Sequence, residues 1–280
     1  MAVEDAGTAG TTGSVEPGHR FRLGVVGVGA IAAVLVEAIV TGPHADEVEV
    51  VLSPRSEHRA ADLAARFASV RVAADNQEVL DSSDVVLLAV LPPQVAEVCA
   101  GLTFREDHVV ANLAAGWPPS VLAALVAPAA PGCQLIPLPM VALRTGPIVM
   151  FPDVAVVRTL LDDCGDVVLL EQESQIIALS CASAIMSSYF ELQRTVVDWL
   201  VSTGLPEQTS HDYVTSQLLA LATEGRTTAP ADRASLPVEH ETPGGLNEQV
   251  RRALTETGTY EALAGTLARM HQERRMRATS

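Results

Sequence analysis

The residues with the clearest chemical pattern lie in a glycine-containing turn near the start of the chain. Residues 27–32 read Gly-Val-Gly-Ala-Ile-Ala, directly after a strand pattern and directly before a helical one. In such a turn the first glycine allows a tight bend, the second lets a pyrophosphate approach the backbone, and the small Ala32 lets helix and strand pack closely. The free N–H groups of the helix N-terminus favour phosphates. The pattern therefore predicts a dinucleotide site that includes Gly27, Gly29, Ala30 and Ile31.

The end of the second predicted strand indicates which dinucleotide is preferred. An acidic residue there would accept a hydrogen bond from a ribose 2′-hydroxyl and would repel a 2′-phosphate. Residues 52–56 read Leu-Ser-Pro-Arg-Ser and contain no acid. Arg55 offers a fork of donors, and Ser53 and Ser56 offer hydroxyls, so the predicted cofactor is NADP(H). The alternative is that the two serines cap the next helix and Arg55 faces solvent.

Composition argues against several classes of function. The formal net charge of -16 leaves no basic face for nucleic acid or an anionic membrane, so neither is an expected partner. All 18 basic residues are arginine, which excludes lysine Schiff-base chemistry. Four cysteines lack C-x-x-C spacing and nearby paired histidines, so we expect buried thiols and no metal site. They are Cys99, Cys133, Cys164 and Cys181.

Apolar periodicity predicts the elements that position the turn. Strand patterns at 23–26, 48–52, 85–90 and 109–113 alternate with helical patterns at 30–40, 56–67, 95–100 and 120–126. Shorter strand patterns follow at 133–136, 148–150 and 167–170, with a helix at 154–161. This alternation predicts an α/β fold, a Rossmann-type, doubly wound and mostly parallel sheet.

The predicted secondary structure changes after Glu171. Only helical patterns follow, at 174–203, 206–224, 246–255 and 260–275, and the polar stretch 227–241 separates the first pair from the second. We therefore expect a disordered tail at 1–20, a dinucleotide-binding domain at 21–172 and an all-helical domain at 173–280. Because residues 1–18 have neither the basic nor the apolar region of a secretion signal, a cytoplasmic location is expected.

From Arg22 onward the chain resembles the pyrroline-5-carboxylate reductase family. The family's glycine turn and Arg-Ser pair match residues 27–32 and 55–56, and Thr-Pro-Gly-Gly at 242–245 is similar to its Ser/Thr-Pro-Gly-Gly motif. Residues 88–94, Leu-Ala-Val-Leu-Pro-Pro-Gln, resemble its loop under the cofactor, and 112–116, Asn-Leu-Ala-Ala-Gly, resemble its turn near the nicotinamide. The resemblance adds these cofactor-binding candidates: Asn76, Ala89, Val90, Leu91, Pro92, Ala115 and Gly116.

The resemblance implies an NADPH-dependent reduction of a cyclic imine, with substrate between the nicotinamide and the Pro-Gly-Gly turn. It also implies a homodimer that interlocks through the helical domain. The long apolar helix at 174–203 agrees with a dimer, although an intramolecular core is the alternative. The implied catalytic residues are Asn247, whose amide would donate to the imine nitrogen, and Thr242. The substrate-binding candidates are Ser183, Gly244, Gly245 and Leu246, and the backbone N–H groups of the last two could hold a substrate carboxylate. Asn247 could instead be a first-turn polar residue of its helix.

Several positions depart from the family pattern. Leu91 stands where the family has lysine, and residues 136–140 read Ile-Pro-Leu-Pro-Met in place of Arg-x-Met-Pro-Asn. Residues 181–185 read Cys-Ala-Ser-Ala-Ile in place of Gly-Ser-Gly-Pro-Ala, and Asn247 replaces a hydroxyl residue. These changes concern substrate more than cofactor and predict a divergent member with a bulkier or less polar substrate. Two alternatives remain open: a reductase of a carbonyl or one with a deazaflavin partner, and a non-catalytic NADP-binding scaffold or sensor.

Overall fold

The computed structural model describes residues 21–278, and the predicted disordered tail at 1–20 lies outside them. The chain divides into two compact units, with the division between Ile176 and Ile177. We call residues 21–176 the first unit and residues 177–278 the helical unit, and describe each by itself.

Within the described residues, one eight-stranded sheet forms the centre of the first unit. Its strands are β1 (Phe21–Val26), β2 (Val48–Leu52), β3 (Val70–Val72), β4 (Val85–Leu88), β5 (Val109–Asn112), β6 (Ala130–Pro137), β7 (Pro147–Phe151) and β8 (Asp166–Leu169). The strand order is β3-β2-β1-β4-β5-β6-β7-β8, in which β1 to β6 run parallel and β7 pairs antiparallel with β6. The strand order reverses between β1 and β4, which is the place where open α/β sheets bind ligands. The predicted Rossmann-type fold class is confirmed.

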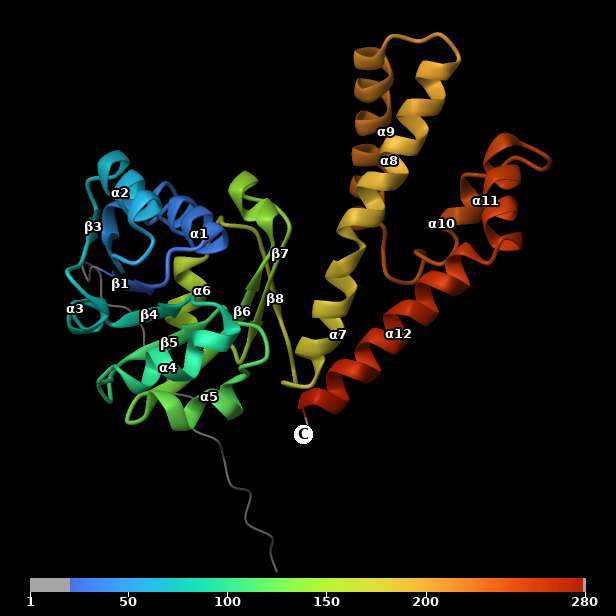
Figure 1. The fold of residues 1–280 in the computed structure, drawn as a ribbon. Coiled ribbons are helices and arrows are strands. Elements are labelled where there is room, and N and C mark those ends of the chain that lie inside the picture. The colour runs from blue at the N-terminus through green and yellow to red at the C-terminus, as the bar shows by residue number, and fades with distance from the viewer. Residues whose placement is uncertain (1–20, 279–280) are drawn as a thin grey trace, which may run out of the picture. The chain divides into compact units, whose positions relative to one another are not determined.

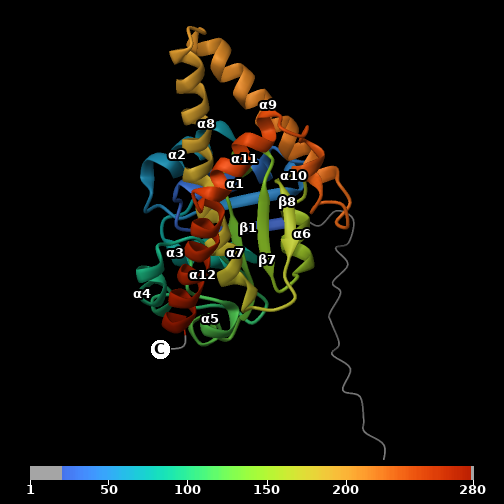
Figure 2. The same ribbon diagram turned by 90° about the vertical axis from the view of Figure 1, so that its right-hand side faces the viewer.

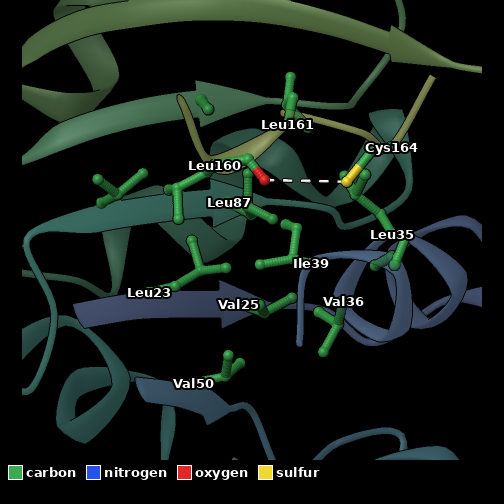
Figure 3. Close-up of a cluster of buried hydrophobic side chains, with 14 of the residues drawn as sticks. Leu23, Val25, Leu35, Val36, Ile39, Val50, Leu87, Leu160, Leu161 and Cys164 are labelled. Atoms are coloured by element: carbon green, nitrogen blue, oxygen red, sulfur yellow. Dashed lines mark hydrogen bonds between the residues drawn. The ribbon is translucent and has the colours of Figure 1, made fainter. Parts of the chain in front are cut away.

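Helices cover both faces of this sheet (Figure 1). They are α1 (Ala30–Val40), α2 (Glu57–Arg66), α3 (Asn76–Asp81), α4 (Val95–Ala100), α5 (Pro119–Val126) and α6 (Ala155–Leu160), with 3-10 turns η1 (Ala45–Glu47), η2 (Pro92–Gln94) and η3 (Pro139–Leu143). Strand alternation sends Val25 to the core under α1 and Val26 to the core under α4 and α5. Figure 3 shows the first of these cores, in which Leu23, Val25, Leu35 and Ile39 pack with Leu160.

Three local features of the first unit differ from the prediction. β3 and α3 were not predicted, because three and six residues are too few to show a clear period. The predicted strands 85–90 and 109–113 end earlier, at Leu88 and Asn112. The residues after each end form loops at the carboxyl edge of the sheet, where a parallel sheet places its functional groups.

Buried polar groups in the first unit are paired. His108 is 2% exposed; its Nδ1 accepts from the Arg105 N–H at 3.0 Å and its Nε2 lies 3.0 Å from the Leu80 carbonyl. Burial and the nearby Arg105 guanidinium lower the pKa of His108. The four cysteines are free and buried, as predicted, and burial raises the pKa of Cys133 to about 12.

The helical unit contains α8 (Met186–Ser202), α9 (Glu207–Thr227), α10 (Leu236–Glu239), α11 (Leu246–Glu256) and α12 (Thr259–Ala278), and α7 (Gln175–Ala182) leads into it. Helices α8 and α9 form an antiparallel hairpin (Figures 1 and 2). The helix predicted at 174–203 is present as a helical run from Gln175 to Ser202, but a 3-10 turn, η4 (Ser183–Ile185), interrupts it between α7 and α8. The polar stretch 227–241 contains the short α10, which the sequence reading missed.

Helix α8 carries a stripe of exposed apolar side chains. None of its residues is buried, although its large side chains recur at helical spacing. Tyr189, Leu192 and Trp199 are 43%, 52% and 62% exposed, and Ile185, the last residue of η4 directly before α8, is 46% exposed and continues the stripe. By length and composition alone, the helical stretch Gln175–Ser202 would also suffice to cross a membrane. A surface of this kind is typical of an interaction face.

Candidate functional site

The turn between β1 and α1 needs glycine at its first position. Gly27 has φ +93°, and a Cβ there would lie 2.8 Å from the carbonyl oxygen of Ala89. The Ser53 hydroxyl accepts a hydrogen bond from the Gly27 N–H at 3.0 Å, and Ser53 is completely buried. Ser53 was predicted to face a phosphate, but its burial makes it a support beneath the glycine turn.

The second glycine of the turn has a different reason to be small. A Cβ on Gly29 would meet no heavy atom within 4 Å, and its φ of −73° suits any residue. Gly29 is the N-cap of α1, and no side chain among the described residues caps this helix. The uncapped N–H groups face open space that a side chain would enter, which fits a bound phosphate group. The residues present therefore fit a dinucleotide.

The carboxyl end of β2 presents free cationic and hydroxyl groups. Arg55 is exposed, and no ion pair to it is found within residues 21–278. Ser56 is the N-cap of α2, yet its side chain makes no capping hydrogen bond. The alternative is met in part, since Arg55 faces solvent and Ser56 occupies the N-cap position, but neither serine makes a capping hydrogen bond to α2. Arg59, in the first turn of α2, is also exposed and is a further candidate that sequence reasoning missed.

The loops after β3, β4 and β5 reach the same edge of the sheet. Asn76 is the first residue of α3, and Leu91, in the loop after β4, is 67% exposed. The Trp117 indole N–H donates to the Pro92 carbonyl at 2.9 Å, which ties the loop after β5 to the loop after β4. Gly116, directly before Trp117 in the loop after β5, has φ +82° and open space where a Cβ would stand. Ala89, Val90 and Ala115 complete these loops.

A buried amide pair holds the loop after β5. Asn112 and Gln134 are 1% and 3% exposed; Asn112 is the last residue of β5 and pairs with Gln134 in the middle of the neighbouring β6. The Asn112 Nδ2 donates to Gln134 Oε1 at 3.0 Å and to the Trp117 carbonyl at 2.7 Å, and its Oδ1 accepts from the Ala114 N–H at 2.9 Å. The pair fixes residues 114–117, the turn predicted to lie near the nicotinamide. Sequence reasoning quoted Asn112 only as part of a motif and missed Gln134.

The Thr-Pro-Gly-Gly turn precedes α11 in the helical unit. Gly244 has φ +73°, and a Cβ on Gly245 would lie 2.8 Å from the Thr242 carbonyl oxygen. The Gly245 N–H donates to that same oxygen at 2.7 Å. The turn itself therefore uses this proton, and a bond from the Gly245 N–H to a substrate carboxylate stays a prediction. The Leu246 N–H lies one residue further, at the first position of α11.

Side chains of α11 secure the turn from the other side. Glu248 Oε2 accepts from the Gly244 N–H at 2.6 Å, and Gln249 Nε2 donates to the Gly244 carbonyl at 2.8 Å. Asn247 Nδ2 donates to the His240 carbonyl at 2.7 Å, so one amide proton of the candidate catalytic residue is committed to the backbone. A glutamate three residues after the N-cap is a sequence pattern that could have revealed the Glu248 contact.

The two remaining candidate residues in this unit, Ser183 and Thr242, differ in whether their hydroxyls are hydrogen-bonded. The Ser183 hydroxyl lies 3.0 Å from the Ser180 carbonyl and 3.3 Å from the Leu179 carbonyl, so it bonds to its own helix. No hydrogen bond to the Thr242 hydroxyl is found within the described part of the chain, and Thr242 is exposed. Thr242 therefore keeps a free donor beside the turn.

The charges beside this turn are mostly acidic. Arg251 forms an ion pair with Glu241, with Nη2 to Oε2 at 2.9 Å, and this pair lowers the pKa of Glu241. His240 Nε2 lies 3.1 Å from Glu224 Oε2. No group of three or more His, Cys, Asp or Glu side chains among the described residues could hold a metal ion.

Comparison with known proteins extends this description. Residues 22–116 match the protein family described as NADP oxidoreductase, coenzyme F420-dependent. The pyrroline-5-carboxylate reductase of Pseudomonas aeruginosa is 26% identical over 253 residues, which are 86% of this chain and 91% of that protein. This match runs through both units.

Solved structures agree in fold. A 1-pyrroline-5-carboxylate reductase from Streptococcus pyogenes has a TM-score of 0.77 at 19% identity and covers 91% of this chain and 98% of its own. A Plasmodium falciparum pyrroline carboxylate reductase with NADP bound has a TM-score of 0.75 at 15% identity and covers 91% and 97%. The predicted resemblance to pyrroline-5-carboxylate reductases is confirmed.

Proposed function

We propose that this chain is an NADPH-dependent reductase of a cyclic imine and acts as a homodimer in the cytoplasm. The observation that carries the proposal is the uncapped N-terminus of α1 beside Gly29, in a chain similar to pyrroline-5-carboxylate reductases through both units. When bound, NADPH supplies a hydride to the imine carbon, and the imine nitrogen takes a proton, giving an amine.

The first unit binds and orients the cofactor. The N–H groups at the start of α1 hold the pyrophosphate, and Arg55 with Ser56 holds the 2′-phosphate. Asn76 and the loop 89–92 line the adenosine and central part of the cofactor. Ala115 and Gly116 lie against the nicotinamide, and the Asn112 network keeps this turn rigid.

The helical unit binds the substrate. The Thr242 hydroxyl, which has no partner in the described structure, bonds the imine nitrogen, and the second amide proton of Asn247 assists it. Gly244, Leu246 and Ser183 shape the site around it. The stripe Ile185, Tyr189, Leu192 and Trp199 is the proposed dimer surface.

The Gly29→Ala variant tests the cofactor site. Because the Cβ has room and φ is compatible, the free energy of unfolding should stay the same or rise by up to about 1 kcal/mol. The Kd for NADPH should nevertheless rise at least about tenfold, because the methyl group enters the phosphate space. Unchanged NADPH binding would refute the proposed site.

The Arg55→Ser variant tests the NADP(H) preference. The Kd for NADPH should rise about tenfold or more, whereas the Kd for NADH should change by less than about twofold. Turnover is then followed at the absorbance of NADPH with a panel of cyclic imines. Tight NADPH binding without oxidation by any imine would favour the scaffold or sensor.

One observation favours a second candidate. The description of the family that matches residues 22–116 names coenzyme F420, so hydride transfer between NADP and a deazaflavin is the alternative. Adding this coenzyme in place of the imine distinguishes the two, since only the alternative predicts NADPH oxidation by it.

A further inference from the structure

The start of α11 already carries a carboxylate. Glu248 folds back so that its Oε2 accepts from the Gly244 N–H at 2.6 Å. The Gly245 N–H is also taken, by the Thr242 carbonyl at 2.7 Å. The two glycine N–H groups of the turn are therefore bonded within the chain, and a substrate carboxylate could reach neither without displacing an internal acceptor.

Acidic side chains outnumber cations at this turn, and Arg251, the cation that acts on the charge of Glu248, is shared with Glu241. Within residues 21–278 Glu248 forms no salt bridge, and the nearby Arg251 is engaged by both oxygens of Glu241. His240, a basic residue before the turn, has its Nε2 3.1 Å from Glu224 Oε2. A ligand bound here therefore meets a net negative charge, which repels an anion and attracts a cation such as a protonated imine.

We propose that Glu248 is a specificity-determining residue that excludes carboxylated substrates, so that this site takes cyclic imines without a carboxylate. The inference rests on the proposed function, because it assumes that the imine binds at the Thr242–Gly245 turn. Thr242 is left to bond the imine nitrogen, and Leu246, the first residue of α11, is apolar and 80% exposed and adds no charge. The site thus favours an imine without a carboxylate, because Glu248 repels the negative charge that a carboxylate would bring.

A matched pair of imines tests the inference. 1-Pyrroline and 1-pyrroline-5-carboxylate differ only in the carboxylate, and kcat/KM for the first should exceed that for the second by about tenfold or more. Glu248→Gln keeps an oxygen acceptor for the Gly244 N–H and removes the charge, so it should reduce this ratio at least about fivefold. Glu256→Gln removes one charge from the far end of the same helix and should leave the ratio unchanged. Equal ratios in the wild type and Glu248→Gln would overturn the proposal.

Binding of the saturated amines gives a readout that needs no turnover. The full-length protein, with NADP⁺ present, is titrated with each amine in a calorimeter. It should bind pyrrolidine more tightly than L-proline, and Glu248→Gln should reduce the difference between the two Kd values. This result without any imine reduction would refute the proposed reductase and still support the charge selection. Equal or tighter binding of L-proline, or binding of neither amine by the folded protein, would overturn the selection.

Discussion

Replacing Asn112 with leucine removes the centre of the buried amide network. Leucine has a similar size, but it leaves the Gln134 Oε1 and the Ala114 N–H without the partners that lie at 3.0 Å and 2.9 Å. Both groups belong to residues at most 3% exposed, so water cannot replace the lost bonds. An unsatisfied buried polar group costs about 1–3 kcal/mol, and leucine burial returns about 1 kcal/mol. For two such groups, the free energy of unfolding should therefore fall by about 1–5 kcal/mol.

A double-mutant cycle with Gln134→Leu attributes this loss to the network. With both amides replaced, no Gln134 oxygen remains unpaired, so the double variant should be about 1–3 kcal/mol more stable than the sum of the single changes predicts. Denaturant unfolding is followed by Trp117 fluorescence in a Trp199→Phe background, since the chain has only 2 tryptophans. Asn76→Leu, at a partly exposed position, is the matched control and should cost less than about 0.5 kcal/mol.

Asn112→Leu also tests how the turn after β5 serves the cofactor. Because Asn112 no longer holds residues 114–117, the Kd for NADPH should rise. The fold of the helical unit should stay intact in this variant. A stability loss below about 1 kcal/mol, or additive effects of Asn112→Leu and Gln134→Leu, would refute the role given to the network.

Three further predictions follow from single features. Gly27→Ala should cost about 2–4 kcal/mol in urea unfolding, because it combines a positive φ with a contact to the Ala89 carbonyl, and a loss as small as that of Gly29→Ala would contradict this. The lowered pKa of buried His108 means that this side chain binds a proton more readily in the unfolded chain than in the folded one. The free energy of unfolding should therefore fall as the pH drops from about 6.5 toward the folded-state pKa. If the slope of this free energy against pH between 7 and 5 were the same in His108→Gln, that would argue against the prediction. Leu192→Glu with Trp199→Glu should shift the protein from dimer to monomer in light scattering, and a persistent dimer would exclude the α8 stripe as the interface.

Local patterns were sufficient for much of the first unit. The helix at Ala30–Val40 and the strand at Val48–Leu52 have the predicted bounds, because apolar spacing and turn residues act over a few positions. The same signals placed Gly29 at a helix start and Arg55 after a strand. The helix predicted at 174–203 has nearly these bounds, but its 3-10 turn at Ser183–Ile185 was missed, since nothing local in the apolar pattern marks it.

By itself the sequence determined the fold class, the glycine turn and the residues available for an NADP 2′-phosphate. Only the tertiary structure decided what those residues contact. Asn112 and Gln134 are 22 positions apart and meet because β5 and β6 are neighbours in the sheet. Ser53 lies beneath Gly27 for the same reason, because β1 and β2 pair in register. Side-chain hydrogen bonds depend on distances of a few tenths of an ångström, which only the packed chain sets.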